Sequence, residues 1–174
     1  APSGQRMELY YETEKYRAPE GKASYLPNQP QSSVSAGVGA ARIDHINVLA
    51  QDVPATRGFM CETLGFKLRE HLIPPGRPEA GAWLSLMNKA HDLAITREPV
   101  PGVTGRLHHL AYAVENREDV LRAADIFCEL GTQIEFGPAK HSRTQGFFLY
   151  VLEPGGNRIE VFAGGFHIFA PDWE

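Results

Sequence analysis

Apolar and polar positions along this chain alternate with two different periods, and the order of these stretches repeats. Runs with period two predict half-buried strands, and runs with apolar residues three or four apart predict amphipathic helices. The first half predicts a strand near 42–48, a helix from about 52 to 64, and strands at 66–73, 82–87 and 92–96. The second half predicts the same series, at 107–114, about 117–130, 133–136, 146–152 and 158–162.

The two predicted helices also end alike. Cys61-Glu62-Thr63-Leu64-Gly65 closes the first and Cys128-Glu129-Leu130-Gly131 closes the second, with glycine as the stop signal in both. Self-similarity on this scale indicates a duplicated unit. The sequence therefore predicts two tandem βαβββ modules, at about 42–97 and 106–163, within a domain that spans 42–174 and includes a C-terminal tail.

The N-terminus contains a third, partial echo. Residues 2–10, PSGQRMELY, resemble residues 154–162, PGGNRIEVF. We therefore expect residues 1–17 to be the last strand of a further βαβββ domain whose other strands are absent, and residues 18–41, rich in Pro, Ser, Gly and Gln, to be a linker. The alternative is a short natural protein with an N-terminal edge strand.

Three residues in predicted strands carry the candidate chemistry: His45, His109 and Glu160. The histidines occupy equivalent places in the first strands of the two modules, and Glu160 lies in the apolar run 159–162. A buried carboxylate is costly unless it is paired or binds a metal. The equivalent strand of the first module has Ala94 there, so the strand itself does not require a glutamate. A single strand histidine is more often structural, but two imidazoles and one carboxylate form the ligand set of a mononuclear non-heme iron(II) site.

Composition narrows the classes of partner. The chain has 174 residues, 43% hydrophobic and 22% charged, with a formal net charge of −4, which favours neither nucleic acid nor an anionic membrane as partner. It has no apolar run long enough to span a bilayer and no secretory signal pattern. Two cysteines do not make a disulfide framework, so reduced thiols and a cytoplasmic location are expected.

The motifs resemble a known family. The segments 84–92, 105–109 and 156–162, within a match from about 42 to 162, are similar to the type I extradiol ring-cleaving dioxygenases of the vicinal oxygen chelate superfamily, and most of all to the catechol 2,3-dioxygenases. The resemblance implies an α+β fold in which the two modules form an open mixed-sheet barrel around a metal site. It also implies that residues 42–174 are the catalytic domain and that the full-length protein is a homo-oligomer.

The resemblance further implies an activity in aromatic hydrocarbon catabolism: cleavage of catechol or a substituted catechol with O2 to a 2-hydroxymuconic semialdehyde. His45, His109 and Glu160 would hold Fe(II), although the same ligands accept Mn(II). We expect an uncharged or alkyl-substituted catechol, because no Arg or Lys lies in a motif that demands a carboxylated substrate.

Five further residues receive roles from the same resemblance. His91, His141 and Tyr150 would be catalytic, with His91 handling protons and Tyr150 donating to a substrate oxygen. Asn47, two residues after His45 and so on the same strand face, would face the oxygen-binding side, and Trp83 would line the substrate pocket. His108 should point away from the metal, because neighbouring side chains on a strand alternate.

Two other functions remain open from the sequence. One is a glyoxalase-like, metal-dependent isomerase, which usually needs a first-module carboxylate where this chain has Ala94. The other is a non-catalytic ligand-binding module of the same superfamily, which has little need for a complete ligand trio.

Overall fold

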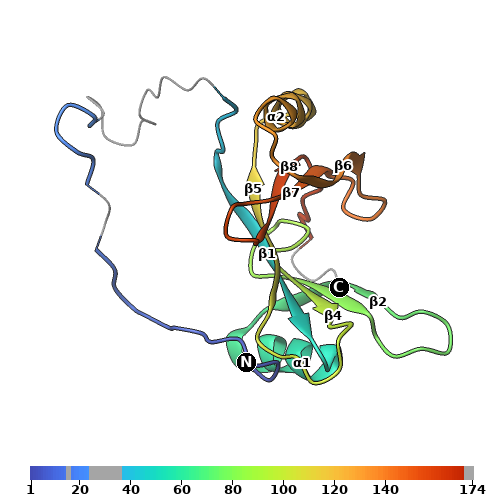
Figure 1. Ribbon diagram of the computed structural model, residues 1–174. Coiled ribbons are helices and arrows are strands. Elements are labelled where there is room, and N and C mark those ends of the chain that lie inside the picture. The colour runs from blue at the N-terminus through green and yellow to red at the C-terminus, as the bar shows by residue number, and fades with distance from the viewer. Residues whose placement is uncertain (15–16, 24–36, 171–174) are drawn as a thin grey trace.

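The structure is a computed structural model that describes residues 1–14, 17–23 and 37–170. Two helices and eight strands follow in the order strand, helix, three strands, twice over (Figure 1). The first series is β1 (Arg42–Ala50), α1 (Val53–Leu64), β2 (Lys67–Leu72), β3 (Gly81–Ser85) and β4 (Leu93–Arg97). The second is β5 (Leu107–Ala113), α2 (Arg117–Glu129), β6 (Ile134–Lys140), β7 (Phe147–Leu152) and β8 (Arg158–Ala163). The two predicted βαβββ modules are therefore present.

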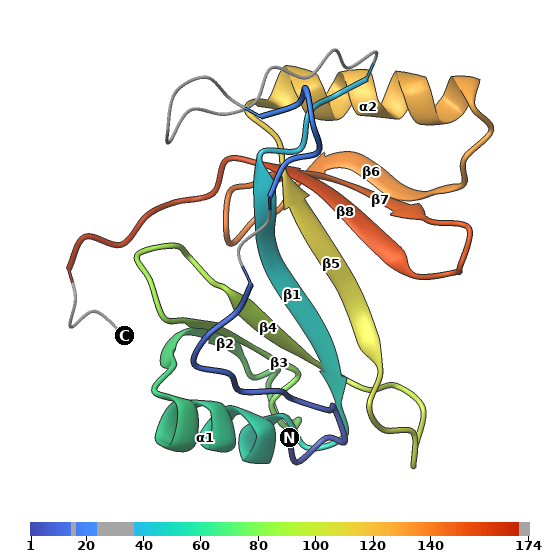
Figure 2. The same ribbon diagram turned by 90° about the vertical axis from the view of Figure 1, so that its left-hand side faces the viewer.

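All eight strands join in one mixed sheet in the order β2-β3-β4-β1-β5-β8-β7-β6. Within each module the first and last strands are parallel, β1 with β4 and β5 with β8. The modules meet at the antiparallel pair of β1 and β5, which lie side by side in the middle of the molecule (Figure 2). The sheet is open, with β2 and β6 as its outer strands, as the predicted fold class requires.

Local sequence signals explain both helices. Asp52 caps α1 by accepting a hydrogen bond from the amide of Ala55 at 2.9 Å, and Asn116 caps α2 by accepting one from Asp119, also at 2.9 Å. Gly65 ends α1 in the left-handed region, with φ of 76°, where glycine has no steric penalty. Neither helix in the described part of the chain has the length and apolar character needed to cross a membrane.

The helices cover one face of the sheet and leave the other face free for a site. Packing of α1 on the first half buries a core that includes Val48, Met60 and Ile95, and packing of α2 on the second half buries Val120 and Leu149. Figure 2 shows the two helices at opposite ends of the sheet, each beside its own module. Because side chains alternate along a strand, the residues between these core positions point to the opposite face.

The N-terminal segment differs from its prediction. Its turn is present: the amide of Gly4 donates to the carbonyl of Ala1 at 3.0 Å, and the φ of Gly4 is 86°. The turn before β8 is built in the same way, because the amide of Gly156 donates to the carbonyl of Glu153 at 2.8 Å and the φ of Gly156 is 87°. The predicted strand is absent: residues 5–14 contain no strand. A strand needs a neighbour to take its backbone hydrogen bonds, and no described strand pairs with this segment. The assignment of residues 1–17 to a further domain stays a prediction, and much of the predicted linker, residues 24–36, lies outside the described residues.

The tail after β8 returns across the sheet. Its backbone pairs with the segment before β4: Ile168 donates to the carbonyl of Asn88 at 2.7 Å, Ala90 donates to that of Phe166 at 3.2 Å, and Lys89 and His167 form an isolated bridge. The tail of the second module thereby fixes a loop of the first, beside the site described next.

Candidate metal centre and its pocket

Two rows of paired residues on the free face of the sheet lay out the candidate site. One row runs from β1 through β5 and β8 to β7, and the other runs from β5 through β1 and β4 to β3. Register places these residues side by side: His45, Ala111, Glu160 and Tyr150 in the first row, and His109, Asn47, Ala94 and Trp83 in the second. The structure thus gathers six of the eight predicted site residues on one face through strand pairing alone.

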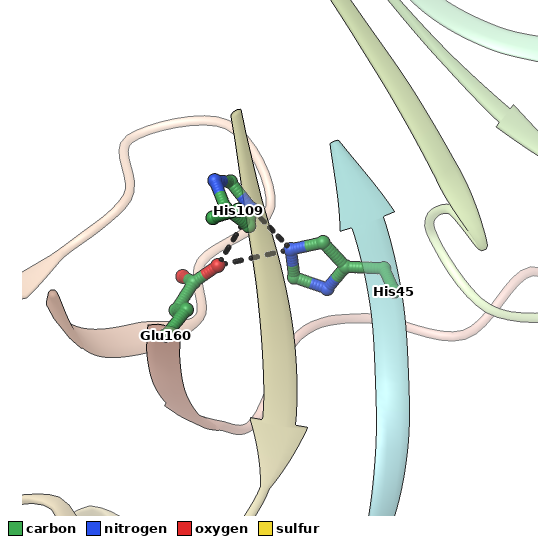
Figure 3. Close-up of side chains that lie close together, drawn as sticks. All are labelled: His45, His109 and Glu160. Atoms are coloured by element: carbon green, nitrogen blue, oxygen red, sulfur yellow. Dashed lines mark hydrogen bonds and ion pairs between the residues drawn. The ribbon is translucent and has the colours of Figure 1, made fainter. Parts of the chain in front are cut away.

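The predicted metal ligands converge at the junction of the rows (Figure 3). Nε2 of His45 and Nε2 of His109 are 3.1 Å apart, and each lies 3.0 Å from Oε2 of Glu160. The three side chains are almost entirely buried, with exposed fractions of 4%, 3% and 0%. Among the described residues they form the one group of three or more histidine, cysteine or acidic side chains close enough to hold a metal ion.

This spacing fits a divalent cation. Metal–ligand distances of about 2.1 Å place ligands at right angles about 3.0 Å apart, which is the spacing of these three atoms. Oε2 of Glu160 also makes no hydrogen bond to the described residues, although it is buried and lies near two imidazoles. A buried carboxylate oxygen without a hydrogen-bond partner is rare in folded proteins and indicates an additional ligand. The donor set therefore fits iron(II) or manganese(II) with coordination positions left open.

Glu160 is held as a carboxylate. Burial by itself would raise its pKa, but the three nearby imidazoles of His109, His141 and His45 outweigh burial and keep the pKa well below its usual value. His141 supplies one of these contacts, with Nε2 3.2 Å from Oε1 of Glu160, while its ring stacks on Phe148 at a centroid distance of 3.8 Å. The site thus carries a fixed negative charge that a cation would neutralise.

A cavity of about 160 Å³ opens beside the trio. Besides the trio's two histidines, its wall includes all five other predicted site residues: Asn47, Trp83, His91, His141 and Tyr150. Seven of the eight predicted site residues therefore line one cavity, although they come from six different segments of the chain.

His91 lies just before β4 with its ring centroid 4.2 Å from that of His45. Burial and the nearby His45 lower its pKa to about 3, so its imidazole is neutral at pH 7. Its Nδ1 is buried and has no hydrogen-bond partner among the described residues. A neutral ring with a free polar atom at a pocket wall is suited to proton exchange with a bound molecule.

Tyr150 and Asn47 present polar groups to the same cavity. The hydroxyl of Tyr150 is 3.5 Å from Nε2 of His141, and burial together with the charge of Glu160 raises its pKa, so the hydroxyl stays protonated. Oδ1 of Asn47 accepts a hydrogen bond from the hydroxyl of Thr96 at 3.1 Å, which fixes the orientation of its amide. Both side chains are therefore pre-oriented hydrogen-bonding groups.

A charged residue of the cavity wall was not predicted from the sequence. Arg143, in the loop between β6 and β7, lines the cavity, with its guanidinium 5.2 Å from the centre of the Trp83 ring. The expectation of an uncharged substrate rested on finding no cationic residue in a motif, and Arg143 weakens that argument. Its position two residues after His141 was the available signal, but loop sequence alone does not show which way a side chain points.

The prediction for His108 was partly wrong. His108 is not part of the candidate trio, but its ring does not lie away from His109: the two Nδ1 atoms are 2.7 Å apart. Asn47 pairs with His109 and Val48 pairs with Leu107, so His108 has no partner on β1. This β-bulge interrupts the alternation of side chains on which the prediction relied.

Comparison with known proteins agrees with this arrangement. Residues 42–161 match the family model described as the Glyoxalase/Bleomycin resistance protein/Dioxygenase superfamily. The manganese-dependent 2,3-dihydroxybiphenyl 1,2-dioxygenase of Geobacillus genomosp. 3 is 43% identical over 175 residues, which cover 99% of this chain and 55% of the relative. The metapyrocatechase of Geobacillus stearothermophilus is 38% identical over 174 residues, which cover 99% of this chain and 53% of the relative.

Among solved structures, the 2,3-dioxygenase LapB from Pseudomonas sp. KL28 superimposes with a TM-score of 0.70 at 32% identity, covering 83% of this chain and 55% of that one. The chain therefore spans about half the length of these relatives. The family match covers most of the chain and includes all eight residues of the two rows, with His45, His109 and Glu160 among them. This protein belongs to the glyoxalase, bleomycin resistance protein and dioxygenase superfamily.

Proposed function

We propose that this chain forms the catalytic part of an extradiol dioxygenase, which cleaves catechol or a substituted catechol with O2 to a 2-hydroxymuconic semialdehyde. The observation that carries the proposal is the convergence of Nε2 of His45, Nε2 of His109 and Oε2 of Glu160 within 3.1 Å of one another, at the wall of a cavity. Relatives named as dioxygenases, at 43% identity and with a TM-score of 0.70, support it.

His45, His109 and Glu160 would hold a divalent metal, with iron(II) as the first candidate. A bound iron(II) or manganese(II) would supply Lewis-acid and one-electron chemistry, with open positions for the catechol and O2. The relative named manganese-dependent supports manganese as the alternative. Loading the same protein with each metal in turn distinguishes the two.

The surrounding side chains would orient the substrate and handle its protons. The neutral ring of His91 accepts a proton from a catechol hydroxyl. The protonated hydroxyl of Tyr150 donates a hydrogen bond to a substrate oxygen and stabilises the charge that develops there. His141, which holds Oε1 of Glu160 at 3.2 Å and is only half-buried, closes the same side of the cavity. Trp83 and Asn47 line the same cavity and limit where the aromatic ring lies.

The direct test is ring cleavage by metal-loaded protein. The protein is loaded anaerobically with iron(II), catechol is added in air, and both the yellow ring-opened product and O2 consumption are followed. We expect one O2 consumed per product and no product with His109→Ala, while the folded content of that variant stays that of the unchanged chain. Stoichiometric metal binding without product from any of several catechols would contradict the proposal and favour the binding-module alternative.

A glyoxalase-like isomerase has less support from the structure. Ala94 occupies the first-module position where such an enzyme needs a carboxylate, and its side chain lines the cavity without offering a ligand atom. Assay with the hemithioacetal of methylglyoxal and glutathione, on the same metal-loaded protein, is the matching negative control.

A further inference from the structure

His45 has a carboxylate partner on the side of its ring that faces away from the metal site. Its Nδ1 lies 3.0 Å from Oδ2 of Asp44, and both residues are buried, with exposed fractions of 4% and 7%. Neighbouring side chains on a regular strand point to opposite faces. Here Ile43 pairs with Tyr112 and His45 pairs with Ala111, so Asp44 has no partner on β5. This β-bulge turns the Asp44 carboxylate towards the ring of its own neighbour.

Asp44 is itself held from its other side by two cations. Nη2 of Arg42 donates to Oδ1 at 2.8 Å, and Nζ of Lys89 lies 3.8 Å from the same oxygen and donates to the Asp44 carbonyl. Lys89 is fixed in turn by its backbone bridge to His167 in the tail. The Asp44 side chain is therefore a carboxylate with a fixed position.

A carboxylate only accepts hydrogen bonds, so Nδ1 of His45 must carry the hydrogen between them. In the neutral ring the lone pair is then on Nε2, the atom that faces His109 and Glu160. Carboxylates that fix metal-binding histidines in this way occur in many metal sites, where they also make the ring a stronger ligand.

His109 is held in a different way. Its Nδ1 faces Nδ1 of His108 at 2.7 Å, and Nε2 of His108 lies 3.2 Å from Nη1 of Arg158. Among the described contacts, His109 therefore has an imidazole, and not a carboxylate, beside its Nδ1.

We propose that Asp44 is a positioning residue of the metal site: it holds His45 as the Nδ1–H tautomer and so presents Nε2 to a divalent cation before the cation arrives. The inference rests on the metal site of the proposed function. Between the two histidines of the trio, only His45 has a carboxylate on Nδ1 among the described contacts.

The test measures metal binding and tautomers, not turnover. Metal-free protein is titrated with Mn(II), and the unbound ion is followed by its electron paramagnetic resonance signal. We expect Asp44→Leu to weaken Mn(II) affinity by about 10- to 100-fold. Asp44→Asn should lie between it and the unchanged chain, because an amide oxygen still accepts from Nδ1 but carries no charge. Asp92→Asn is the matched control: Asp92 pairs with the same Lys89 at 2.9 Å, but its carboxylate accepts hydrogen bonds from Ser85 and from backbone amides, including that of Leu86, and none from His45.

A nitrogen–proton correlation spectrum of the histidine rings in the metal-free protein gives a second readout, which a merely structural role would not change. We expect hydrogen on Nδ1 of His45 in the unchanged chain and a mixture of tautomers in Asp44→Leu. If Asp44→Leu does not fold, as judged by circular dichroism, Asp44→Asn carries both measurements.

Either of two results would overturn the inference. One is that folded Asp44→Leu binds Mn(II) as tightly as the unchanged chain, and the other is that neutral His45 of the unchanged chain carries its hydrogen on Nε2. The outcome is separable from the proposed function. If Mn(II) affinity depends on Asp44 but the protein cleaves no catechol, the inference is supported and the proposed function is overturned. If the protein cleaves catechol but its Mn(II) affinity does not depend on Asp44, the function is supported and the inference is overturned.

Discussion

Ala94 and Glu160 occupy the same position in the two halves of the sheet. Glu160 pairs with Ala111, two residues beyond His109, and Ala94 pairs with Asn47, two residues beyond His45. Both pairings are parallel, and Ala94 lines the cavity while Glu160 lies beside the two histidines of its wall. The duplicated architecture therefore offers two equivalent places for a carboxylate, and this chain fills only one of them.

The absence of a carboxylate at Ala94 leads to a prediction for Ala94→Glu. A carboxylate there would extend into the space that the substrate needs and would compete for an open metal position. We expect the variant to retain or increase its metal content while catechol cleavage falls by roughly 100-fold, in line with other misplacements at reacting centres. Metal analysis and the ring-cleavage assay on one preparation check both parts, with Ala94→Ser as control. Full cleavage by Ala94→Glu would show that the position is remote from the substrate.

The lowered pKa of His91 should make the stability of the metal-free protein depend on pH. The pKa of this imidazole is 6.5 in an ordinary environment and about 3 in the folded chain. The unfolded chain therefore takes up a proton near pH 6.5 that the folded chain takes up only near pH 3, and stability is lost as the pH falls through this window. The loss is at most about 5 kcal/mol.

Urea unfolding at several pH values measures this effect. His91→Gln should make the free energy of unfolding fall less steeply between pH 7 and pH 4. His167→Gln, at an exposed position in the tail, should leave the slope unchanged. His108, whose pKa is also lowered, to about 4, stays in both variants and accounts for part of the remaining slope. Equal slopes for His91→Gln and the unchanged chain would contradict the burial of a neutral His91.

Tyr150→Phe should separate catalysis from metal binding. The substitution removes the hydroxyl that faces the cavity and leaves the aromatic ring, which packs at 5.0 Å from Phe148. We expect turnover of catechol to fall by about 10- to 1000-fold, the range seen when one donor to a developing charge is removed. Mn(II) affinity should stay within about twofold. Tyr112→Phe is the control: Tyr112 lies on β5, two strands away from β7, and is absent from the cavity wall, so the turnover of this variant should be unchanged.

A methyl group added at Gly146, just before β7, should disturb the candidate metal site through Phe162. A methyl group at Gly146 would lie 2.0 Å from Cε2 of Phe162, whose ring stands edge-on to His45 at a centroid distance of 5.4 Å. Gly146→Ala should therefore displace Phe162, cost about 1–3 kcal/mol of stability and weaken Mn(II) binding.

Thermal unfolding and Mn(II) titration check this prediction. Gly39→Ala is the control, because a methyl group there meets no atom within 4 Å. If Gly146→Ala loses stability but binds Mn(II) as before, Phe162 packs without influence on His45.

Local patterns were enough to predict the elements, because alternation, caps and stop signals act within a few residues. The one large boundary error is informative. The strand predicted at 133–136 continues to Lys140, through Pro138, since β6 is an outer strand where a proline need not donate to a neighbour. The repeat, in turn, was enough to predict that His45 and His109 meet, because equivalent residues of paired modules lie near the axis that relates them.

Features that depend on strand pairing were not predictable from one strand at a time. The bulges at Asp44 and His108 exist only relative to the opposite strand, and each turns a side chain that alternation places elsewhere. Arg143 reaches the cavity through the course of a loop. The strand expected after Gly4 is absent for the same physical reason. A sequence pattern can favour an extended segment, but a strand also needs a neighbouring strand to form its backbone hydrogen bonds.

The seam between β1 and β5 has a further consequence. His45 belongs to the first module, whereas His109 and Glu160 belong to the second, so neither module contains the trio by itself. A cation bound there would tie the modules together, adding a cross-link at the place where the halves of the sheet touch. Damage that only loosens their contact would then appear first as a folded protein depleted of metal. Metal content is therefore an earlier and more sensitive measure of how well the halves fit than any measure of unfolding.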